Sequence, residues 1–137
     1  MTPAALAALH GRCFATPRPW AEAEFVLFAT DPLVFVLVEG DAGFLLGRAV
    51  AGDAEVLTLA VAPEARRRGL GRKLVARFLY QARLRGAGSA FLEVSAENAA
   101  AIALYESAGF AATGRRKGYY ATPEGARIDA IVMWRDL

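Results

Sequence analysis

The stretch Glu64–Leu74, EARRRGLGRKL, concentrates positive charge and backbone freedom between two apolar segments. Its basic and glycine residues are Arg66, Arg67, Arg68, Arg72, Lys73, Gly69 and Gly71. A glycine-containing turn that leads from a strand into a helix presents free N–H groups and the positive helix end to an anion. Glycine also removes side chains that would hold a phosphate away from the backbone. From these residues alone, the turn fits an anion site and a solvated basic loop about equally well.

Two common phosphate-binding motifs are excluded for this turn. A P-loop requires a Ser or Thr after Gly-x-x-x-x-Gly-Lys, and the segment GLGRKL has neither. A dinucleotide-binding fingerprint requires a third glycine three positions after Gly71, where Leu74 stands. If the turn binds a phosphate, it does so in another structural context.

Three polar residues further along the chain could take part in acid–base chemistry or ligand binding. Glu93 alternates with the apolar residues Leu92 and Val94, so a strand would direct its side chain to the opposite face. Asn98 precedes an alanine-rich segment and is a suitable helix N-cap. Tyr105 follows on the same predicted helix, where a core aromatic is the default. Because most strand glutamates are solvated, the residue pattern by itself favours a surface role for Glu93.

Other candidate residues lack the partners that their chemistry would need. His10 has no second histidine or acid at ligand spacing, so we expect no metal site. Cys13 is the single cysteine, which excludes an internal disulfide, and no basic partner would activate it as an acyl-enzyme nucleophile. The run Arg115–Lys117 with Tyr119–Tyr120 is too short to indicate RNA binding.

The composition is that of one globular domain, which we expect to span residues 1–137. Hydrophobic residues make up 55% and charged residues 22% of the chain, and the net charge is +2. This small excess of positive charge suits an anionic ligand without requiring nucleic acid. No segment has membrane-spanning length, and no basic region precedes the first apolar residues. With the lone cysteine, these features predict a cytoplasmic protein that binds neither membranes nor nucleic acid.

Periodicity and turn residues predict a mixed sheet covered by helices. Apolar residues recur at helical spacing from Leu70 to Ala82, and that helix ends near Gly86. Thr2 and Pro3 are suited to begin the first helix, and Gly109 to end the last one. The expected order is helices over 2–12 and 21–30, strands over 33–40, 43–50 and 54–63, a helix from Leu70 to near Gly86, a strand over 89–95, a helix over 99–108, and strands over 110–120 and 126–134.

The turn pattern Arg66-x-x-Gly69-x-Gly71 after a strand resembles the acetyl-CoA pyrophosphate loop of the GNAT acyltransferases, Gln/Arg-x-x-Gly-x-Gly/Ala. Residues 92–120, LEVSAENAAAIALYESAGFAATGRRKGYY, followed by DAIVM, are similar to the second half of the ribosomal-protein alanine N-acetyltransferases, the RimI type. The segment RPWAEAEF is similar to their FPW segment between the first two helices. Together these segments cover nearly the whole chain, in order, so the resemblance is far more specific than a glycine motif alone.

The resemblance implies an α/β (α+β) fold with a mixed, mostly antiparallel sheet, a split between two parallel strands and about four flanking helices. It implies that acetyl-CoA is the cosubstrate and that its pantetheine pairs with the backbone of one strand at the split. The implied cofactor-binding residues are Leu59, Ala60, Val61, Arg66, Arg67, Arg68, Gly69, Leu70, Gly71, Arg72 and Asn98.

The resemblance also implies the catalytic residues: Glu93 as general base and Tyr105 as general acid toward the departing thiolate. The reaction would be direct attack of a primary amine on the thioester, with no metal. The N-terminal α-amine of a protein, such as a ribosomal protein, is the expected acceptor. Two alternatives stay open: an acetyltransferase for a small amine (a polyamine or an amino-sugar), and a non-catalytic acyl-CoA-binding module, which would need neither residue.

The sequence departs from the family pattern at four points. The chain begins at the first helix, so we expect the N-terminal edge strand of the family to be missing. Ala62 stands where an Asp often precedes the proline, Arg66 replaces a more frequent Gln, and Ser95 replaces a frequent Arg. None of these departures falls on Glu93 or Tyr105.

Overall fold

The computed structural model describes all residues, 1–137, and begins with two helices, α1 (Pro3–Cys13) and α2 (Glu22–Ala29). The start of α1 is the one predicted, because the Thr2 hydroxyl accepts a hydrogen bond from the N–H of Ala5 at 3.1 Å. Pro3 lies in the first turn, where the absence of an N–H costs nothing. None of the helices has the length and the apolar run that crossing a bilayer requires.

Six strands follow in one sheet of order β1-β2-β3-β4-β6-β5. Short turns make β1, β2 and β3 antiparallel neighbours, and β6 pairs antiparallel with both β4 and β5. Only β3 and β4 run parallel. The predicted element order is confirmed, with a short 3-10 turn, η1 (Pro63–Ala65), added after β3. The strands are β1 (Val34–Glu39), β2 (Gly43–Val50), β3 (Asp53–Val61), β4 (Ser89–Ser95), β5 (Ala111–Ala121) and β6 (Arg127–Asp136).

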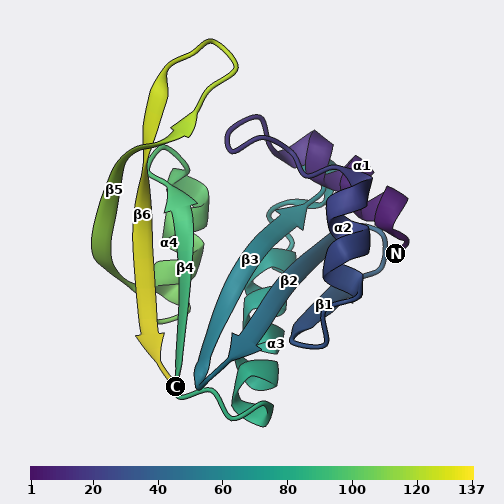
Figure 1. Cartoon of the computed structure of the whole chain (residues 1–137), viewed down its shortest axis with the longest axis vertical. Coiled ribbons are helices and arrows are strands. Elements are labelled where there is room, and N and C mark those ends of the chain that lie inside the picture. The colour runs from purple at the N-terminus through teal and green to yellow at the C-terminus, as the bar shows by residue number, and fades with distance from the viewer.

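The parallel pair β3–β4 is joined at one end only. Its pairing is limited to residues 53–55 of β3 with residues 89–91 of β4, while β3 stays paired with β2 as far as Val61. Beyond Glu55 the two strands diverge, which gives the sheet the V shape seen in Figure 1. A register shift opposite Leu46 and Gly47 leaves Leu57 as an extra residue in β3, and such a bulge bends a strand. The predicted split between two parallel strands is confirmed.

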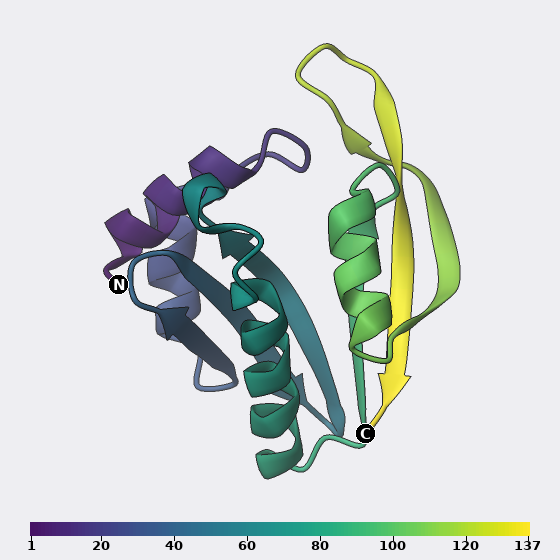
Figure 2. The ribbon, with the colours of Figure 1, turned by 180° about the vertical axis from the view of Figure 1, so that it is seen from behind.

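Helices cover the two faces of the sheet unequally. α3 (Leu70–Leu84) and α4 (Ala99–Ser107) lie on one face, while α1 and α2 lie on the other face over β1–β3 (Figures 1 and 2). The predicted apolar stripe of α3 is buried in the larger core, where Phe78 stacks on Phe35 with ring centroids 5.9 Å apart. A second core of eight buried residues lies under α1 and α2. No helix covers β4, β6 and β5 on the face of the sheet where α1 and α2 lie. On that face, this half of the sheet is open beside the split.

Candidate active site

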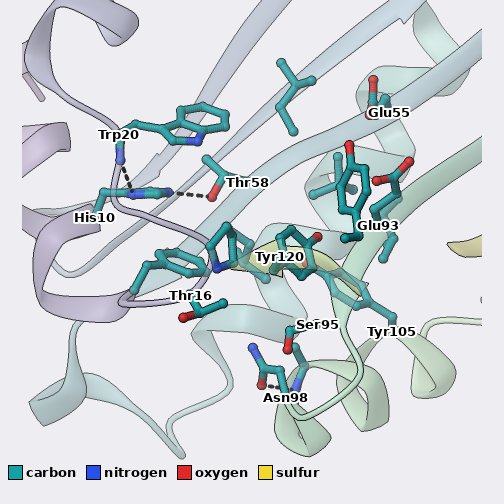
Figure 3. A pocket seen from close by; sticks show the side chains of 18 residues that line it. His10, Thr16, Trp20, Glu55, Thr58, Glu93, Ser95, Asn98, Tyr105 and Tyr120 are labelled. Atoms are coloured by element: carbon teal, nitrogen blue, oxygen red, sulfur yellow. Dashed lines mark hydrogen bonds between the residues drawn. The ribbon is translucent and has the colours of Figure 1, made fainter. Parts of the chain in front are cut away.

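A pocket of about 340 Å³ lies where β3 and β4 separate (Figure 3). Its walls come from α1 and the loop after it, from β3 and β4, from α4 and from β5. Of the residues predicted from the sequence, the pocket brings together Leu59, Glu93, Asn98 and Tyr105. Ala60, Val61 and the turn 66–72 lie outside its lining. The pocket therefore unites both candidate catalytic residues with only one end of the expected cofactor site.

Glu93 points into the pocket from β4. Its neighbours Leu92 and Val94 are buried in the core under α3 and α4, so Glu93 faces the other side of the sheet, as predicted. One carboxylate oxygen forms an ion pair with Nε of Arg116 at 3.1 Å, and the side chain keeps 22% of its exposure. Because Arg116 holds Oε1 and nothing in the chain bonds Oε2, one oxygen is available to a proton donor in the pocket.

Tyr105 is a core ring with its polar end at the pocket. The residue is 5% exposed, belongs to the larger core, and packs edge-to-face on Phe110 at 5.9 Å. Its hydroxyl makes no hydrogen bond within the chain, yet no fully buried side-chain oxygen lacks a partner, so this oxygen opens onto the pocket. Burial raises the pKa of Tyr105 well above its usual value, so the phenol is protonated at neutral pH.

Asn98 caps α4, as the sequence predicts. Its side-chain oxygen accepts a hydrogen bond from the N–H of Ala101 at 3.1 Å. Asn98 lines the pocket and its side-chain NH₂ group has no partner in the chain, so capping leaves a donor for a ligand. The helix cap and a binding role are compatible because they use different atoms.

The open edge of β3 offers backbone groups of alternate residues. The Ala62 N–H donates to the Ala42 carbonyl of the β1–β2 turn at 2.7 Å, so the two-residue period of a strand directs the backbone of Ala60 toward β2 as well. The backbone groups of Leu59 and Val61 then face the split. The Val61 carbonyl accepts hydrogen bonds from Nε of Arg66 at 3.1 Å and from the Cys13 thiol at 3.4 Å. The N–H and C=O of Leu59 and the N–H of Val61 thus have no strand partner on this edge.

The basic turn begins α3 in a conformation suited to an anion. Arg67 and Gly69 have φ values of 63° and 78°, and no side chain caps the first turn of the helix. Lys73 is paired with Glu39 at 3.2 Å, whereas the exposed side chains of Arg67, Arg68 and Arg72 form no ion pair in the chain. Unbonded helix N–H groups and three unpaired guanidinium groups fit a pyrophosphate.

Sequence reasoning missed a second carboxylate in the pocket. Glu55 lies on β3 at the last position that pairs with β4, at the closed end of the split. One of its oxygens accepts a hydrogen bond from Nη2 of Arg48 at 3.1 Å. The alternation in AEVLTLAV indicates that Glu55 lies on a strand. Only the pairing of β3 with β4 shows that this position borders the pocket at the split.

Sequence reasoning also gave His10 no partner, and the structure supplies one. The ring is buried at 1% exposure, its Nδ1 accepts the backbone N–H of Trp20 at 3.0 Å, and its Nε2 lies 2.9 Å from Oγ1 of Thr58. Because Nδ1 is an acceptor, the ring proton is on Nε2, which donates to Thr58. Burial lowers the pKa of His10 to about 4, so the ring is neutral at neutral pH. No group of three His, Cys, Asp or Glu side chains could hold a metal ion.

The split sheet, the uncapped basic turn and the pocket at the split fit an enzyme whose cosubstrate carries a negatively charged group. The chain belongs to the acetyltransferase (GNAT) family, whose sequence model matches residues 4–110. Members of this family use acetyl-CoA, and the chain is an acetyl-CoA-dependent N-acetyltransferase.

The relatives share almost the full length of the chain. It is 40% identical over 130 residues to the [ribosomal protein bS18]-alanine N-acetyltransferase of Escherichia coli strain K12, covering 93% of this chain and 87% of that protein. It is 36% identical over 138 residues to the N-alpha-acetyltransferase RimI of Mycobacterium tuberculosis, covering 95% and 84%. The crystal structure of the E. coli ribosomal-protein-S18-alanine N-acetyltransferase superposes with a TM-score of 0.85 at 36% identity, covering 96% of this chain and 85% of that one.

Proposed function

We propose that the protein transfers the acetyl group of acetyl-CoA to the N-terminal α-amine of a protein, with Glu93 as general base and Tyr105 as general acid. The observation that carries this proposal is that a carboxylate oxygen and a protonated phenol open into one pocket where β3 and β4 part. The names of the relatives support a protein N-terminus as acceptor, and a ribosomal protein is the first class of acceptor to test.

Most of the residues that would hold acetyl-CoA follow the chain from β3 in the pocket to the start of α3. The pantetheine would pair with the free backbone groups of Leu59 and Val61 on the open edge of β3. Gly69–Arg72 and the exposed guanidinium groups of Arg67 and Arg68 would hold the pyrophosphate. Arg66 acts differently from the other arginines, because its Nε is bonded to the Val61 carbonyl and fixes the turn against β3. When bound, the thioester supplies an activated acyl carbon and a thiolate leaving group.

The protein side of the reaction requires one proton to be removed and another to be delivered. Glu93 takes the proton of the acceptor amine through its free oxygen, directly or through a water molecule. Tyr105, on α4, directs its hydroxyl proton toward the departing sulfur from the α3–α4 side of the sheet, opposite the face on which Glu93 lies. An α-amine has a reference pKa near 8 and a lysine near 10.4, so deprotonation at neutral pH costs the lysine about 3 kcal/mol more. A carboxylate base is therefore better matched to an N-terminal amine.

The turn should lose affinity for acetyl-CoA when a carboxylate enters it. In Gly71→Asp, a negative charge joins a Cβ that would lie 3.1 Å from the side chain of Leu104. We expect acetyl-CoA to bind at least about tenfold more weakly, or about 1.4 kcal/mol, by calorimetry on the folded variant. Gly71→Asn carries the same bulk without the charge and should retain more of the affinity. Equal binding by Gly71→Asp and the wild type would reject the pyrophosphate site.

The acceptor is tested by steady-state release of CoA with a panel of amines. Peptides with a free N-terminus, peptides with lysine and a blocked N-terminus, polyamines and amino-sugars are compared at equal concentration. We expect kcat/KM to be highest for the free N-terminal peptides. A polyamine or amino-sugar as the best substrate would replace the proposed acceptor. Binding of acetyl-CoA with no turnover of any amine would instead indicate a non-catalytic acyl-CoA-binding module.

A further inference from the structure

Thr58 presents a hydroxyl whose rotation is restricted by a buried histidine. Oγ1 of Thr58 accepts the Nε2 proton of His10, which leaves the Thr58 O–H as a donor. No acceptor in the chain takes this proton, and Thr58, which is 9% exposed, lines the pocket. A hydroxyl normally rotates to suit its surroundings, but this one has its acceptor side occupied. The pocket thus contains a hydrogen-bond donor with restricted rotation.

The histidine is itself held on several sides. Its ring stacks on Phe14 with centroids 4.3 Å apart and on Trp20 at 5.2 Å, and it meets Phe25 edge-on at 5.7 Å. The Trp20 N–H bonds Nδ1, which ties the loop after α1 to the imidazole and through it to β3. Figure 3 shows this Trp20–His10–Thr58 series on one side of the pocket, with Glu93 on the other. A ring clamped in this way cannot turn to release Thr58 without disrupting the α1 core.

Thr58 and Glu93 approach the split from the same face of the sheet. Thr58 faces α1 through His10, and Glu93 faces away from the α3–α4 core. Both side chains also line the same pocket, so an acceptor whose amine lies at Glu93 shares that pocket with the Thr58 hydroxyl. The carboxylates of Glu55 and Glu93 can only accept hydrogen bonds when ionised, so neither can bind a carbonyl oxygen.

We propose that the Thr58 hydroxyl donates a hydrogen bond to the first peptide carbonyl of the acceptor, and that His10 is the positioning residue that directs it. This inference rests on the proposed function and adds a structural basis for α-amine selectivity. In an N-terminal residue the carbonyl carbon is two bonds from the amine nitrogen, so one donor can locate both groups. A lysine ε-amine follows four methylene groups, and a polyamine has no carbonyl, so neither can place a carbonyl at Thr58 while its amine is at Glu93.

The test compares a pair of variants on a pair of substrates. Thr58→Val keeps the branched shape and removes the donor, while Thr58→Ser keeps the donor. The substrates are an alanyl peptide with a free N-terminus and its analogue in which a methylene replaces the first carbonyl. We expect Thr58→Val to lower kcat/KM at least about tenfold for the peptide and to leave the analogue almost unchanged. Thr58→Ser should retain the wild-type preference for the peptide over the analogue.

The substrate pair separates a binding role from loss of stability, because a damaged fold lowers both kcat/KM values together. An equal loss on both substrates, or no loss on the peptide, overturns the role of Thr58 and leaves the proposed function standing. If the wild-type protein acetylates polyamines or lysine peptides but not the alanyl peptide, the proposed function fails, and the inference fails with it.

The role of His10 is tested by its coupling to Thr58. His10→Asn should lower the peptide-to-analogue preference as Thr58→Val does, and the double variant should lose no further preference. Independent, additive losses in the folded double variant would show that His10 does not act through Thr58. If His10→Asn does not fold, the Thr58 variants still decide whether the hydroxyl binds the carbonyl.

Discussion

Glu93→Gln is expected to lower kcat at pH 7 by roughly 10²–10⁴-fold while the affinity for acetyl-CoA stays near that of the wild type. The amide keeps the size of the side chain and its place on β4, but it cannot take a proton from the amine. The cofactor turn at the start of α3 lies outside the pocket that holds Glu93, so cosubstrate binding should not sense the change. The measurements are kcat with the best acceptor of the panel and acetyl-CoA affinity by calorimetry.

The pH profile of the variant gives a second, independent readout. An N-terminal amine with a pKa near 8 loses its proton unaided as the pH rises through 8, so the need for a base falls. The gap between wild type and Glu93→Gln should therefore narrow from pH 7 to pH 9. Activity of the variant equal to the wild type at pH 7, or a gap that stays constant with pH, would remove Glu93 as general base.

Glu55→Gln is the matched control. Glu55 lines the same pocket and, like Glu93, has one oxygen held by an arginine, Arg48 in place of Arg116. It lies where β3 and β4 are still paired, whereas Glu93 lies where they have separated. If any carboxylate in the pocket acts only through its charge, the two variants should lose similar activity. A large loss for Glu93→Gln and a small one for Glu55→Gln assigns the proton transfer to Glu93.

Local sequence patterns predicted the helices and strands because the residues that cap an element or form its apolar face lie within it or next to it. The α3 stripe buries five side chains that recur at helical spacing, and Thr2 and Asn98 cap the helices they precede. The split sheet is a different matter. Nothing in the residues of β3 or β4 shows that they pair over three positions and then part, since that depends on the bulge and on how the helices pack. Only the family resemblance predicted it.

The site shows the same division between local and long-range information. The alternation of apolar residues placed Glu93 on the correct face of its strand, but its ion pair with Arg116 depends on the register of β4, β6 and β5. His10 and Thr58 are 48 residues apart, and no spacing rule connects them. From the sequence, His10 could only be described as lacking metal-binding neighbours, and nothing indicated its contact with Thr58.

Tyr105→Phe separates the two roles that this side chain combines. The ring belongs to the larger core and packs on Phe110, and phenylalanine preserves that packing. The hydroxyl makes no hydrogen bond within the chain, so its removal should lower the free energy of unfolding by less than the roughly 1 kcal/mol of a typical hydrogen bond. The melting temperature should therefore change very little. If the hydroxyl serves the leaving thiolate, kcat should fall by roughly 10²-fold with acetyl-CoA affinity almost unchanged.

The raised pKa of Tyr105 limits how large that fall can be. A buried phenol stays protonated across the working range of pH, so it is always a donor, but it is a weaker acid than the thiol it would form. Complete proton transfer to a thiolate with a pKa near 8.5 is uphill, and the hydroxyl therefore acts mainly as a hydrogen bond to charge developing on sulfur. That contribution places the expected loss near the lower end of the range for general acids.

The loss of kcat in Tyr105→Phe should also stay constant from pH 7 to pH 9, because Tyr105 does not titrate there. This contrasts with the narrowing gap expected for Glu93→Gln. Full kcat with a lowered melting temperature would leave Tyr105 as a core residue alone.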